Sequence, residues 1–484
     1  MALLERLVAD GKTGLYIGGE WSDGSNGQRI EVHDPATEEI IASVASASPE
    51  DGVRAAAAAY DAAEVWAATA PRARSDVLRR AYELILEREK QFAELITLEN
   101  GKALSDAIGE VRYGAEFFRW FSEEAVRIRG ELYRAPGGDK QVFVLHQPVG
   151  VSLLVTPWNF PLSMGTRKIG PALAAGCTVV LKPASDTPLI ALALADVLEE
   201  AGCPPGVVNV IPADRSAAVV NAVMGDTRVR KLSFTGSTEV GRVLLAEASK
   251  RVLNTSMELG GNAPFLVLPD ADLDAAVEGA LLAKMRNAGE ACTAANRFYV
   301  HAAVADEFAD KLTSGMERLT LGGGMEDGVD VGPLINASTR DKVAELVEDA
   351  ADDGEVLTGG SAPQRAGYFY LPTVIKNVAR NAGILATEIF GPVAPIVPFD
   401  DLDDAIDQAN DTEMGLISYV YAGDERAAMK IAERLEAGMV AVNRGLISDP
   451  AAPFGGYKQS GLGREGSWQG LHEYLESKYI GATW

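Results

Sequence analysis

Apolar and amphipathic segments alternate along the chain from residue 150 to residue 251. Short, mainly apolar runs predict buried strands at 151–156, 178–181, 207–211 and 231–234. Each run is followed by a stretch with helical spacing, at 164–175, 188–201, 217–224 and 239–251. Strands separated by helices of this length pair in parallel through right-handed crossovers. The pattern therefore predicts an α/β fold with a doubly wound sheet, a nucleotide-binding architecture that many unrelated functions share.

A second α/β series begins near residue 262. Strand-like runs at 264–268 and 298–301 flank a helical stretch at 273–287, so the restart places a domain boundary near Leu259. Upstream of the first series, Ala-rich and Leu-rich stretches at 49–70 and 71–100 predict helices that cover its sheet. Segment 130–147 differs, because two β-type runs flank the turn signal Pro136-Gly137-Gly138-Asp139. A hairpin is expected there.

Length and composition narrow the class of protein. A chain of 484 residues exceeds one ordinary core, and domains of ~100 to 200 residues each suggest two large lobes. The longest apolar runs are well short of the ~20 residues that span a bilayer, so no membrane segment is expected. Residues 1–12 lack the apolar core of an export signal, which favours a cytoplasmic location. A net charge of −25 argues against nucleic acid and anionic membrane as partners, since both need clustered Lys and Arg.

Cysteines and histidines are few. The three cysteines, at 177, 203 and 292, show no paired spacing, and none of the four histidines lies near another or near a cysteine. A reducing compartment is expected, and neither a metal centre nor a His-based triad is predicted.

Cys292 is the candidate nucleophile. It follows Asn287-Ala288-Gly289-Glu290-Ala291, where a predicted helix runs into a polar, Gly-containing loop that can expose a thiol. An unperturbed thiol has a pKa of ~8.5, so catalysis would need nearby dipoles or charges to lower it. A lone cysteine taken by itself is more often a small buried apolar residue, so its context must decide.

Two further polar residues stand where predicted strands end. Glu258 precedes the pair Gly260-Gly261, and a carboxylate beside apolar neighbours tends toward a raised pKa that suits a general base. Asn159 follows the first parallel strand, where its amide could donate to a developing oxyanion. The simpler alternatives are a surface acid and a turn-forming Asn.

Segment 234–241, Phe-Thr-Gly-Ser-Thr-Glu-Val-Gly, connects a strand to a helix and presents backbone N–H groups that attract phosphate. It is not a P-loop, because Arg242 and Val243 stand where Lys and Ser/Thr are required. Gly461, Gly463 and Gly466 spell GxGxxG, but no strand precedes them, so we interpret this match as chance or a turn.

Together and in this order, these segments resemble the aldehyde dehydrogenase superfamily over nearly the whole chain, from Ile17-Gly18-Gly19-Glu20-Trp21 onward. The resemblance rests on PWNFP at 157–161, Lys182-Pro183-Ala184, the 234–241 turn, MELGG at 257–261, Cys292, EIFGP at 388–392 and PFGG at 453–456. It implies a Rossmann-like cofactor domain at 1–126 and 148–259 and an α/β catalytic domain at 260–452. It also implies small β oligomerisation arms at 127–147 and 467–484, and hence a homodimer or homotetramer.

The resemblance implies specific roles. The Cys292 thiolate would attack an aldehyde, the Asn159 amide and the Cys292 N–H would hold the oxyanion, and Glu258 would activate water that hydrolyses the thioester. Lys182 and Glu388 would hold the adenine-side and nicotinamide-side riboses, Ser237 the pyrophosphate, and Phe390 would lie by the nicotinamide. The remaining cofactor contacts implied are Thr156, Pro157, Trp158, Gly236 and Leu259.

Cofactor preference depends on Ser185. Relatives that favour NAD carry an acid at this place, which repels a 2′-phosphate, whereas Ser leaves room beside Lys182. We therefore expect NADP to be accepted well and to be slightly favoured over NAD.

Within the superfamily, the chain is most similar to succinate-semialdehyde dehydrogenases through segments 166–180, 286–289, 445–448 and 458–466. Arg167, Arg286 and Ser448 would then bind the distal carboxylate of a small semialdehyde, unless the arginines pair with structural acids. Glutarate semialdehyde and neutral aliphatic aldehydes are the alternative substrates, and a non-catalytic structural or binding protein is a more distant alternative. Glu290-Ala291 departs from the usual motif, which has Gln before the cysteine, and affects the expected shape of the substrate loop.

Overall fold

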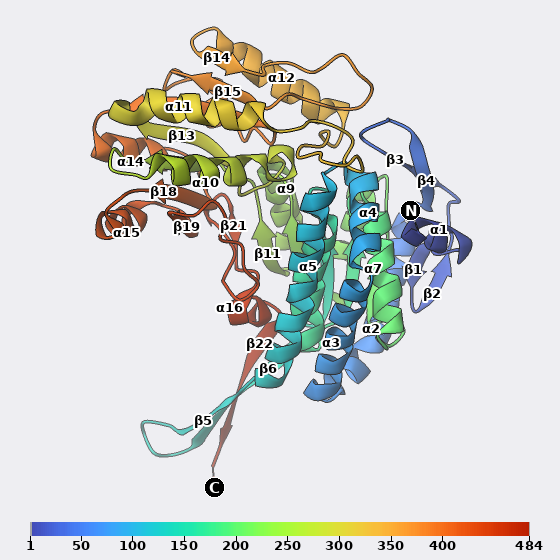
Figure 1. The fold of residues 1–484 in the computed structure, drawn as a ribbon. Helices are drawn as coiled ribbons and strands as arrows, with labels where there is room; N and C mark the ends of the chain where they lie inside the picture. Colours follow the sequence, from blue (N-terminus) through green and yellow to red (C-terminus); the bar gives the residue numbers. More distant parts are fainter. Residues whose placement is uncertain (1, 484) are drawn as a thin grey trace.

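The computed structural model describes residues 2–483, so Met1 and Trp484, the outer limits of the predicted cofactor domain and second arm, lie outside the described residues. Figure 1 shows two α/β bodies and a narrow arm that projects from one of them. Among residues 2–483, no helix has both the length and the apolar character needed to cross a membrane.

The first body is built on an eight-stranded sheet. Its parallel strands, in spatial order, are β9 (Val208–Val210), β8 (Val179–Lys182), β7 (Val151–Val155), β10 (Val229–Thr235) and β11 (Asn254–Glu258). Short antiparallel strands extend its edges: β1 (Leu15–Ile17) and β2 (Glu20–Ser22) beyond β9, and β21 (Gly461–Leu462) beyond β11. The order runs outward from β7 in both directions, which confirms the predicted doubly wound sheet.

Side chains of this sheet alternate into two hydrophobic cores. Leu154 and Leu181 face one core and Leu153 and Val180 face the other, as the period of two along a strand requires. The first core is closed by α3 (Pro71–Glu87), α4 (Glu89–Asn100), α5 (Leu104–Glu124), α6 (Pro161–Ala175) and α7 (Leu189–Glu200). The second is closed by α2 (Pro49–Ala68), α8 (Ser216–Gly225) and α9 (Thr238–Ser249).

Two predicted helices are corrected. Segment 71–100 is broken at Arg88, whose backbone leaves the helical region and whose guanidinium binds Glu200 at 2.5 Å. The break lets α4 pack on both α5 and α7. The helix predicted at 273–287 ends earlier, as α10 (Leu273–Met285), because Asn287 and Ala288 adopt left-handed backbone angles with φ of 52°.

The second body is built on a seven-stranded sheet. Its parallel strands are β15 (Thr373–Lys376), β16 (Val393–Phe399), β13 (Ala295–His301), β12 (Ala263–Val267), β18 (Ile417–Tyr421) and β19 (Met439–Val442), with β14 (Glu355–Thr358) antiparallel at one edge. One core joins this sheet to α10, α11 (Ala302–Glu317), α12 (Ala337–Ala351), α13 (Gly383–Ala386), α14 (Leu402–Asn410) and α15 (Glu425–Arg434). The strands predicted at 264–268 and 298–301 are confirmed.

The projecting arm is a three-stranded sheet. The predicted hairpin is confirmed as β5 (Glu131–Arg134) and β6 (Gln141–Pro148). The C-terminal strand β22 (Leu475–Ala482) pairs antiparallel with the whole of β6, from Leu475 opposite Pro148 to Ala482 opposite Gln141. Strands from the two segments predicted as arms therefore form one sheet (Figure 1). Further short elements are β3 (Arg29–His33), β4 (Ile40–Ala45), β17 (Met414–Gly415), β20 (Tyr457–Lys458), α16 (Ser467–His472) and two 3-10 turns, η1 (Ala125–Arg127) and η2 (Arg286–Gly289).

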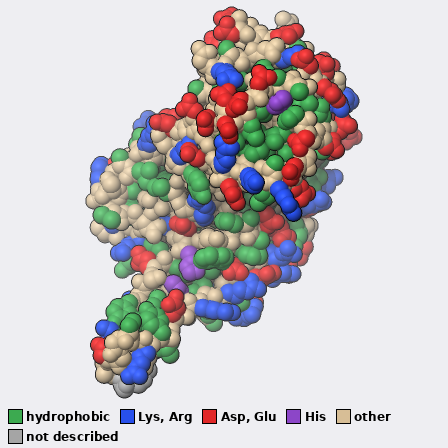
Figure 2. Space-filling view, turned by 90° about the vertical axis from the view of Figure 1, so that its left-hand side faces the viewer, with side chains coloured by type: hydrophobic (Ala, Val, Ile, Leu, Met, Phe, Trp, Pro, Cys, Tyr) green, Lys and Arg blue, Asp and Glu red, His purple; other side chains and the backbone are tan. Residues whose placement is uncertain are grey.

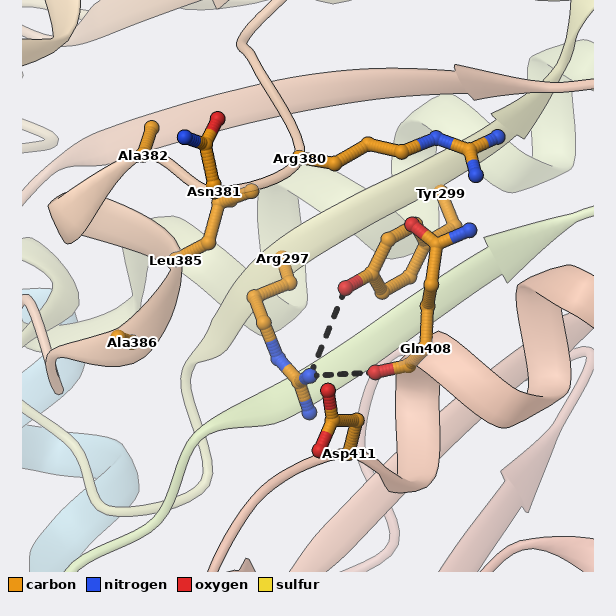
Figure 3. A pocket seen from close by; sticks show the side chains of 9 residues that line it. All are labelled: Arg297, Tyr299, Arg380, Asn381, Ala382, Leu385, Ala386, Gln408 and Asp411. Carbon is orange, nitrogen blue, oxygen red and sulfur yellow. Dashed lines mark hydrogen bonds between the residues drawn. The ribbon is translucent and has the colours of Figure 1, made fainter.

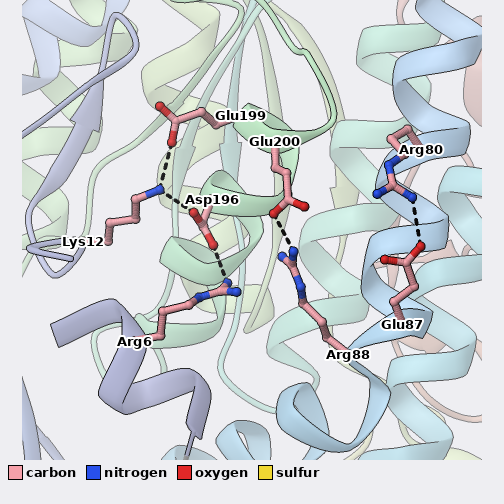
Figure 4. Close-up of polar contacts among 8 residues, drawn as sticks. All are labelled: Arg6, Lys12, Arg80, Glu87, Arg88, Asp196, Glu199 and Glu200. Carbon is pink, nitrogen blue, oxygen red and sulfur yellow. Dashed lines mark hydrogen bonds and ion pairs between the residues drawn. The ribbon is translucent and has the colours of Figure 1, made fainter. Parts of the chain in front are cut away.

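The N-terminal helix α1 (Ala2–Ala9) is fastened to α7. Its side chains Leu3, Leu4 and Leu7 are buried, and Arg6 pairs with Asp196 at 2.5 Å. Lys12 adds a second ion pair to Asp196 at 2.5 Å, as Figure 4 shows. Residues 2–12 are therefore held by the buried leucines of α1 and by the ion pairs of Arg6 and Lys12 with Asp196 of α7.

Candidate active site

The carboxyl ends of β7 and β10 form the point where the winding of the sheet reverses. In doubly wound sheets this point opens a crevice in which ligands bind. Pro157, Trp158 and Asn159 follow β7 directly, and Gly236 and Ser237 follow β10. A cavity of about 240 Å³ lies there, lined by Pro157, Trp158, Asn159, Met164, Thr235, Gly236, Ser237, Leu259, Gly260, Cys292, Thr339, Lys342, Glu388 and Phe390.

The cavity brings together residues from both bodies. Cys292 and Asn159 share its wall with seven residues expected to contact the cofactor: Pro157, Trp158, Gly236, Ser237, Leu259, Glu388 and Phe390. Glu258, Thr156, Lys182, Ser185, Arg167, Arg286 and Ser448 do not line it, although Glu258 and Thr156 adjoin residues that do.

Five lining residues were missed by sequence reasoning. Thr235 and Gly260 stand inside motifs that were recognised, so those motifs could have indicated both. Met164 lies outside them, in the first turn of α6. Thr339 and Lys342 come from α12 in the second body. No local signal connects α12 to the cavity, because only the packing of the two bodies brings it there.

A larger hollow of about 550 Å³ lies elsewhere in the second body (Figure 3). It contains no residue singled out in the sequence. Its buried guanidinium, Arg297, donates to the main-chain oxygens of Asn262, Gln408 and Ala409, with its Nη1 also 3.5 Å from the Tyr299 hydroxyl. Arg297 therefore has its hydrogen-bonding capacity filled by the fold itself.

Cys292 is half-buried, whereas Cys177 and Cys203 are buried. Burial raises the pKa of the Cys292 thiol to about 12, and Glu388 and Glu258 add to the rise. Arg167 and Arg286 act in the opposite direction. Loss of hydration therefore outweighs the two guanidinium charges, so these surroundings do not supply the lowering that a pre-formed thiolate would need.

Glu258 ends β11 and is 3% exposed. Burial, and then the negative charge of Glu465, raise the pKa of its carboxyl well above the usual range. Its Oε2 has no hydrogen-bond partner among the described residues. A buried carboxyl with an unfilled acceptor and a raised pKa has the properties of a general base for water.

Asn159 is also 3% exposed and is held from several sides. Its Nδ2 donates to the Glu290 main-chain oxygen at 3.0 Å. Lys102, buried in an ion pair with Glu110, donates to the Asn159 main-chain oxygen at 2.7 Å. Within residues 2–483 no protein acceptor is found for the Cys292 N–H, so this N–H and the second amide hydrogen of Asn159 remain as donors.

The two arginines predicted for substrate binding differ. Arg167 is 2% exposed, donates to the Tyr113 hydroxyl at 2.7 Å and lies 3.5 Å from Glu465. Its Nε has no partner among the described residues. Arg286 is half-buried and donates to Thr293 at 3.2 Å. The fold thus pairs Arg167 with a structural acid, and among residues 2–483 no recorded contact joins the half-buried Ser448 to either arginine.

Glu388 lies against the glycine pair of the MELGG motif. Gly261 N–H donates to its Oε1 at 3.1 Å, and a Cβ at Gly260 would stand 2.8 Å from its Oε2. Burial raises the pKa of Glu388 to about 7. Phe390 has a left-handed backbone, with φ of 54°. Its ring packs edge-on against the ring of Trp158, with the two ring centroids 5.4 Å apart. These contacts fix the second body's wall of the cavity against the first.

Comparisons with known proteins agree with this geometry. The model of the aldehyde dehydrogenase family matches residues 21–480. A protein of Paenarthrobacter nicotinovorans named succinate-semialdehyde dehydrogenase is 54% identical over 443 residues, 91% of this chain and 98% of that protein. A Pseudomonas aeruginosa protein named glutarate-semialdehyde dehydrogenase is 49% identical over 466 residues, 96% of each. The crystal structure of an E. coli NADP-dependent enzyme superposes with a TM-score of 0.96 at 48% identity and covers 98% of both chains.

Proposed function

The chain belongs to the aldehyde dehydrogenase family, and from this premise we propose that it oxidises succinate semialdehyde to succinate through a thioester on Cys292. Members of the family oxidise aldehydes, so the chain is an aldehyde-oxidising enzyme. The observation that carries the proposed mechanism is the cavity wall shared by Cys292, Asn159 and the predicted cofactor contacts.

The side chains supply a nucleophile, oxyanion donors and a base. Cys292 Sγ bonds to the aldehyde carbon, and the carbonyl oxygen, which gains the electron pair, accepts from the Asn159 amide and the Cys292 N–H. Because the thiol pKa is about 12, the thiol proton must pass to a water molecule as the bond between sulfur and carbon forms. After oxidation, Glu258 accepts a proton from the water that attacks the thioester carbon, and the C–S bond breaks.

The cavity, together with the end of the neighbouring strand β8, suits a nicotinamide dinucleotide, which supplies the hydride acceptor when bound. Lys182 is 5% exposed, and burial lowers its pKa to about 8, with Asp186 offsetting part of the effect. Thr235 Oγ1 lines the cavity and has no hydrogen-bond partner among the described residues. A buried amine and an unfilled hydroxyl suit a polar ligand. Lys182 and Ser185 would hold the adenine-side ribose, Ser237 the pyrophosphate and Glu388 the other ribose.

The cofactor is NAD or NADP, as in the family, and we propose a slight preference for NADP. Ser185 is half-buried and presents a hydroxyl, not a carboxylate, at the end of β8. The nearby carboxylate of Asp186 is directed to Asn336 Nδ2, which lies 3.5 Å away. The similar E. coli structure is described as NADP-dependent, which supports the same preference.

We propose succinate semialdehyde as the substrate because positively charged side chains lie near Cys292. Arg167 and Arg286 both act electrostatically on Cys292, so both guanidinium groups lie near the nucleophile. The half-buried Arg286 can donate to a distal carboxylate, with Ser448 as a second donor, whereas the buried Arg167, held by Glu465 and Tyr113, would contribute mainly its positive charge. Glutarate semialdehyde is the second candidate, because a relative of 49% identity carries that name.

The test compares wild type with Cys292→Ala and Glu258→Gln on succinate semialdehyde, glutarate semialdehyde and a neutral aldehyde of matched length. Cys292→Ala should form no reduced cofactor. Glu258→Gln should give one burst of reduced cofactor and then stop, because the thioester forms but is not hydrolysed. Full activity of Cys292→Ala would remove the mechanism, and equal efficiency on the neutral aldehyde would remove the carboxylate preference.

We propose that the arm mediates a homodimer or homotetramer. Leu132, Tyr133, Leu145, Tyr479 and Ile480 are large apolar side chains exposed on β5, β6 and β22. Figure 2 shows hydrophobic side chains gathered on this projecting end. An exposed apolar sheet is stabilised by pairing with another subunit. The domain limits at 126, 148, 259 and 452 and the cytoplasmic location stay predictions.

A further inference from the structure

Asn287 lies between two segments of the site that are far apart in the sequence. Its Nδ2 donates to the Asn159 main-chain oxygen at 3.0 Å and to the Glu290 main-chain oxygen at 3.1 Å. A carbonyl oxygen only accepts, so the atom facing both must be the amide nitrogen. Asn287 is 1% exposed, and both hydrogens of its amide are used. One side chain therefore ties the turn after β7 to the loop that carries Cys292.

The Glu290 oxygen is also the acceptor of the Asn159 side chain. Asn159 Nδ2 donates to it at 3.0 Å, so this one carbonyl receives two amide N–H groups. The Glu290 carboxylate anchors the same residue on its other side, accepting from the Ile335 N–H at 3.0 Å. Because a carbonyl oxygen has two lone pairs, its position fixes where each amide points. The second N–H of Asn159 is left to the cavity that it shares with Cys292.

The backbone of Asn287 is held in a conformation that few residues adopt. Its φ and ψ are 52° and 45°, and Ala288 and Gly289 follow at φ of 52° and 79°. The Asn287 N–H donates to Asp106 of α5 at 2.7 Å. A Cβ on Gly289 would lie 2.2 Å from the Gly391 oxygen. Successive left-handed residues cost free energy and persist only where surrounding contacts hold them, which is common at functional sites.

We propose that Asn287 is a positioning residue for the oxyanion donors: by joining the Asn159 and Glu290 main chains, it sets the direction of the Asn159 amide relative to Cys292. The proposal rests on the proposed function, in which Asn159 stabilises the oxyanion. Asn287 touches no reacting atom and acts through Asn159. Its removal should therefore impair the step that develops charge on the aldehyde oxygen and leave cofactor binding intact.

The test is a double-mutant cycle on the full-length enzyme with Asn287→Gly, Asn159→Ala and the double variant. Gly accepts φ of 52° without strain, so Asn287→Gly removes the amide and keeps the backbone path. Loss of one oxyanion donor lowers kcat by roughly 100-fold to 1,000-fold. We expect Asn159→Ala to fall in that range and Asn287→Gly to lose about tenfold or more. The double variant should lose no more than Asn159→Ala alone, because Asn287 acts through Asn159.

Asn209 provides a matched control. It is fully buried and its Nδ2 also bridges two main-chain oxygens, those of Val179 at 3.1 Å and Gly206 at 2.8 Å, but it lies away from the cavity. Asn209→Gly should lower Tm while kcat stays near wild type. Cofactor affinity, measured by fluorescence titration, should change less than about twofold in Asn287→Gly.

Two results would overturn the proposal: a kcat for Asn287→Gly close to wild type, or losses in the double variant that multiply those of the single variants. If Asn287 only supported the structure, the kcat losses of the two single variants would multiply in the double variant, and Asn287→Gly would bind the cofactor more weakly. If Cys292→Ala or Asn159→Ala were as active as wild type, the proposed function itself would fail. If both behave as expected and only the Asn287 cycle does not, the proposed function stands and this inference falls.

Discussion

The guanidinium of Arg167 lies 3.5 Å from the carboxylate of Glu465, with the two side chains only 2% and 7% exposed. Lys168 completes the cluster at 2.6 Å from the same carboxylate. Burial raises the pKa of Glu465, but Lys168 and then Arg167 outweigh it and hold that pKa below the usual value. Glu465 is therefore ionised beside Glu258, where it raises the Glu258 pKa while Lys168 and Arg167 lower it.

The cluster predicts opposite pH shifts for two variants. Thioester hydrolysis needs ionised Glu258, so kcat should fall on the acid side as this carboxyl gains a proton. Glu465→Gln removes a negative charge, lowers the Glu258 pKa and should move the acid limb of kcat to lower pH by about one unit. Arg167→Met removes a positive charge and should move it to higher pH. The measurement is the pH profile of kcat, and shifts of the same sign in both variants would contradict this account.

Arg286 should control the reactivity of the nucleophile. The Cys292 pKa is about 12, so the thiolate fraction at neutral pH is small and alkylation by iodoacetamide should accelerate about tenfold per pH unit. Arg286→Leu removes a charge that lowers this pKa and should slow alkylation at every pH below it. The matched control is Arg286→Lys, which keeps the positive charge at this half-buried position. In this variant Cys292 should be alkylated at nearly the wild-type rate.

Ser185 should set the cofactor preference. Ser185→Glu places a carboxylate beside Lys182, where it would repel a 2′-phosphate and accept from ribose hydroxyls. We expect kcat/KM for NADP to fall about tenfold or more relative to that for NAD. Ser185→Gln, with similar size and no charge, should produce a much smaller change. If the ratio of kcat/KM for NADP to that for NAD were the same in both variants, the volume of the side chain at position 185, and not its charge, would set the cofactor preference.

The buried pair Lys102–Glu110 should be costly to break and cheaper to replace. Both side chains are 0% exposed and 2.6 Å apart. Lys102→Met leaves the buried Glu110 without its cation and with only the Leu162 and Ser163 N–H donors, and breaking a buried pair in this way typically costs about 3–5 kcal/mol of unfolding free energy. The double variant Lys102→Met, Glu110→Gln removes both charges and should recover part of that loss. Tm and denaturant titration test this, and an equal loss in the single and double variants would contradict it.

The sequence indicated the parallel strands and the motif residues because those signals are local. The apolar run of β7 and the Gly pair after Glu258 each depend on neighbours only a few residues away. The helix ends at Arg88 and Met285 were not predicted, because the packing of α4 on α5 and α7 and the left-handed turn at Asn287 override local helical preference. The raised pKa of Cys292 was also not readable from the sequence, because the hydration of its thiol depends on tertiary packing.

The sequence by itself proposed Cys292, Glu258 and Asn159 as nucleophile, base and amide donor, because their motifs, taken in order, resemble the aldehyde dehydrogenase superfamily. Only the tertiary structure determined which charged and polar side chains lie beside them. Arg167 and Glu465 are 298 residues apart in the chain, and Asn159 and Glu290 are 131 apart. The physical reason is that charge, burial and hydrogen-bond geometry act through space over a few ångströms, and sequence spacing carries no measure of that distance.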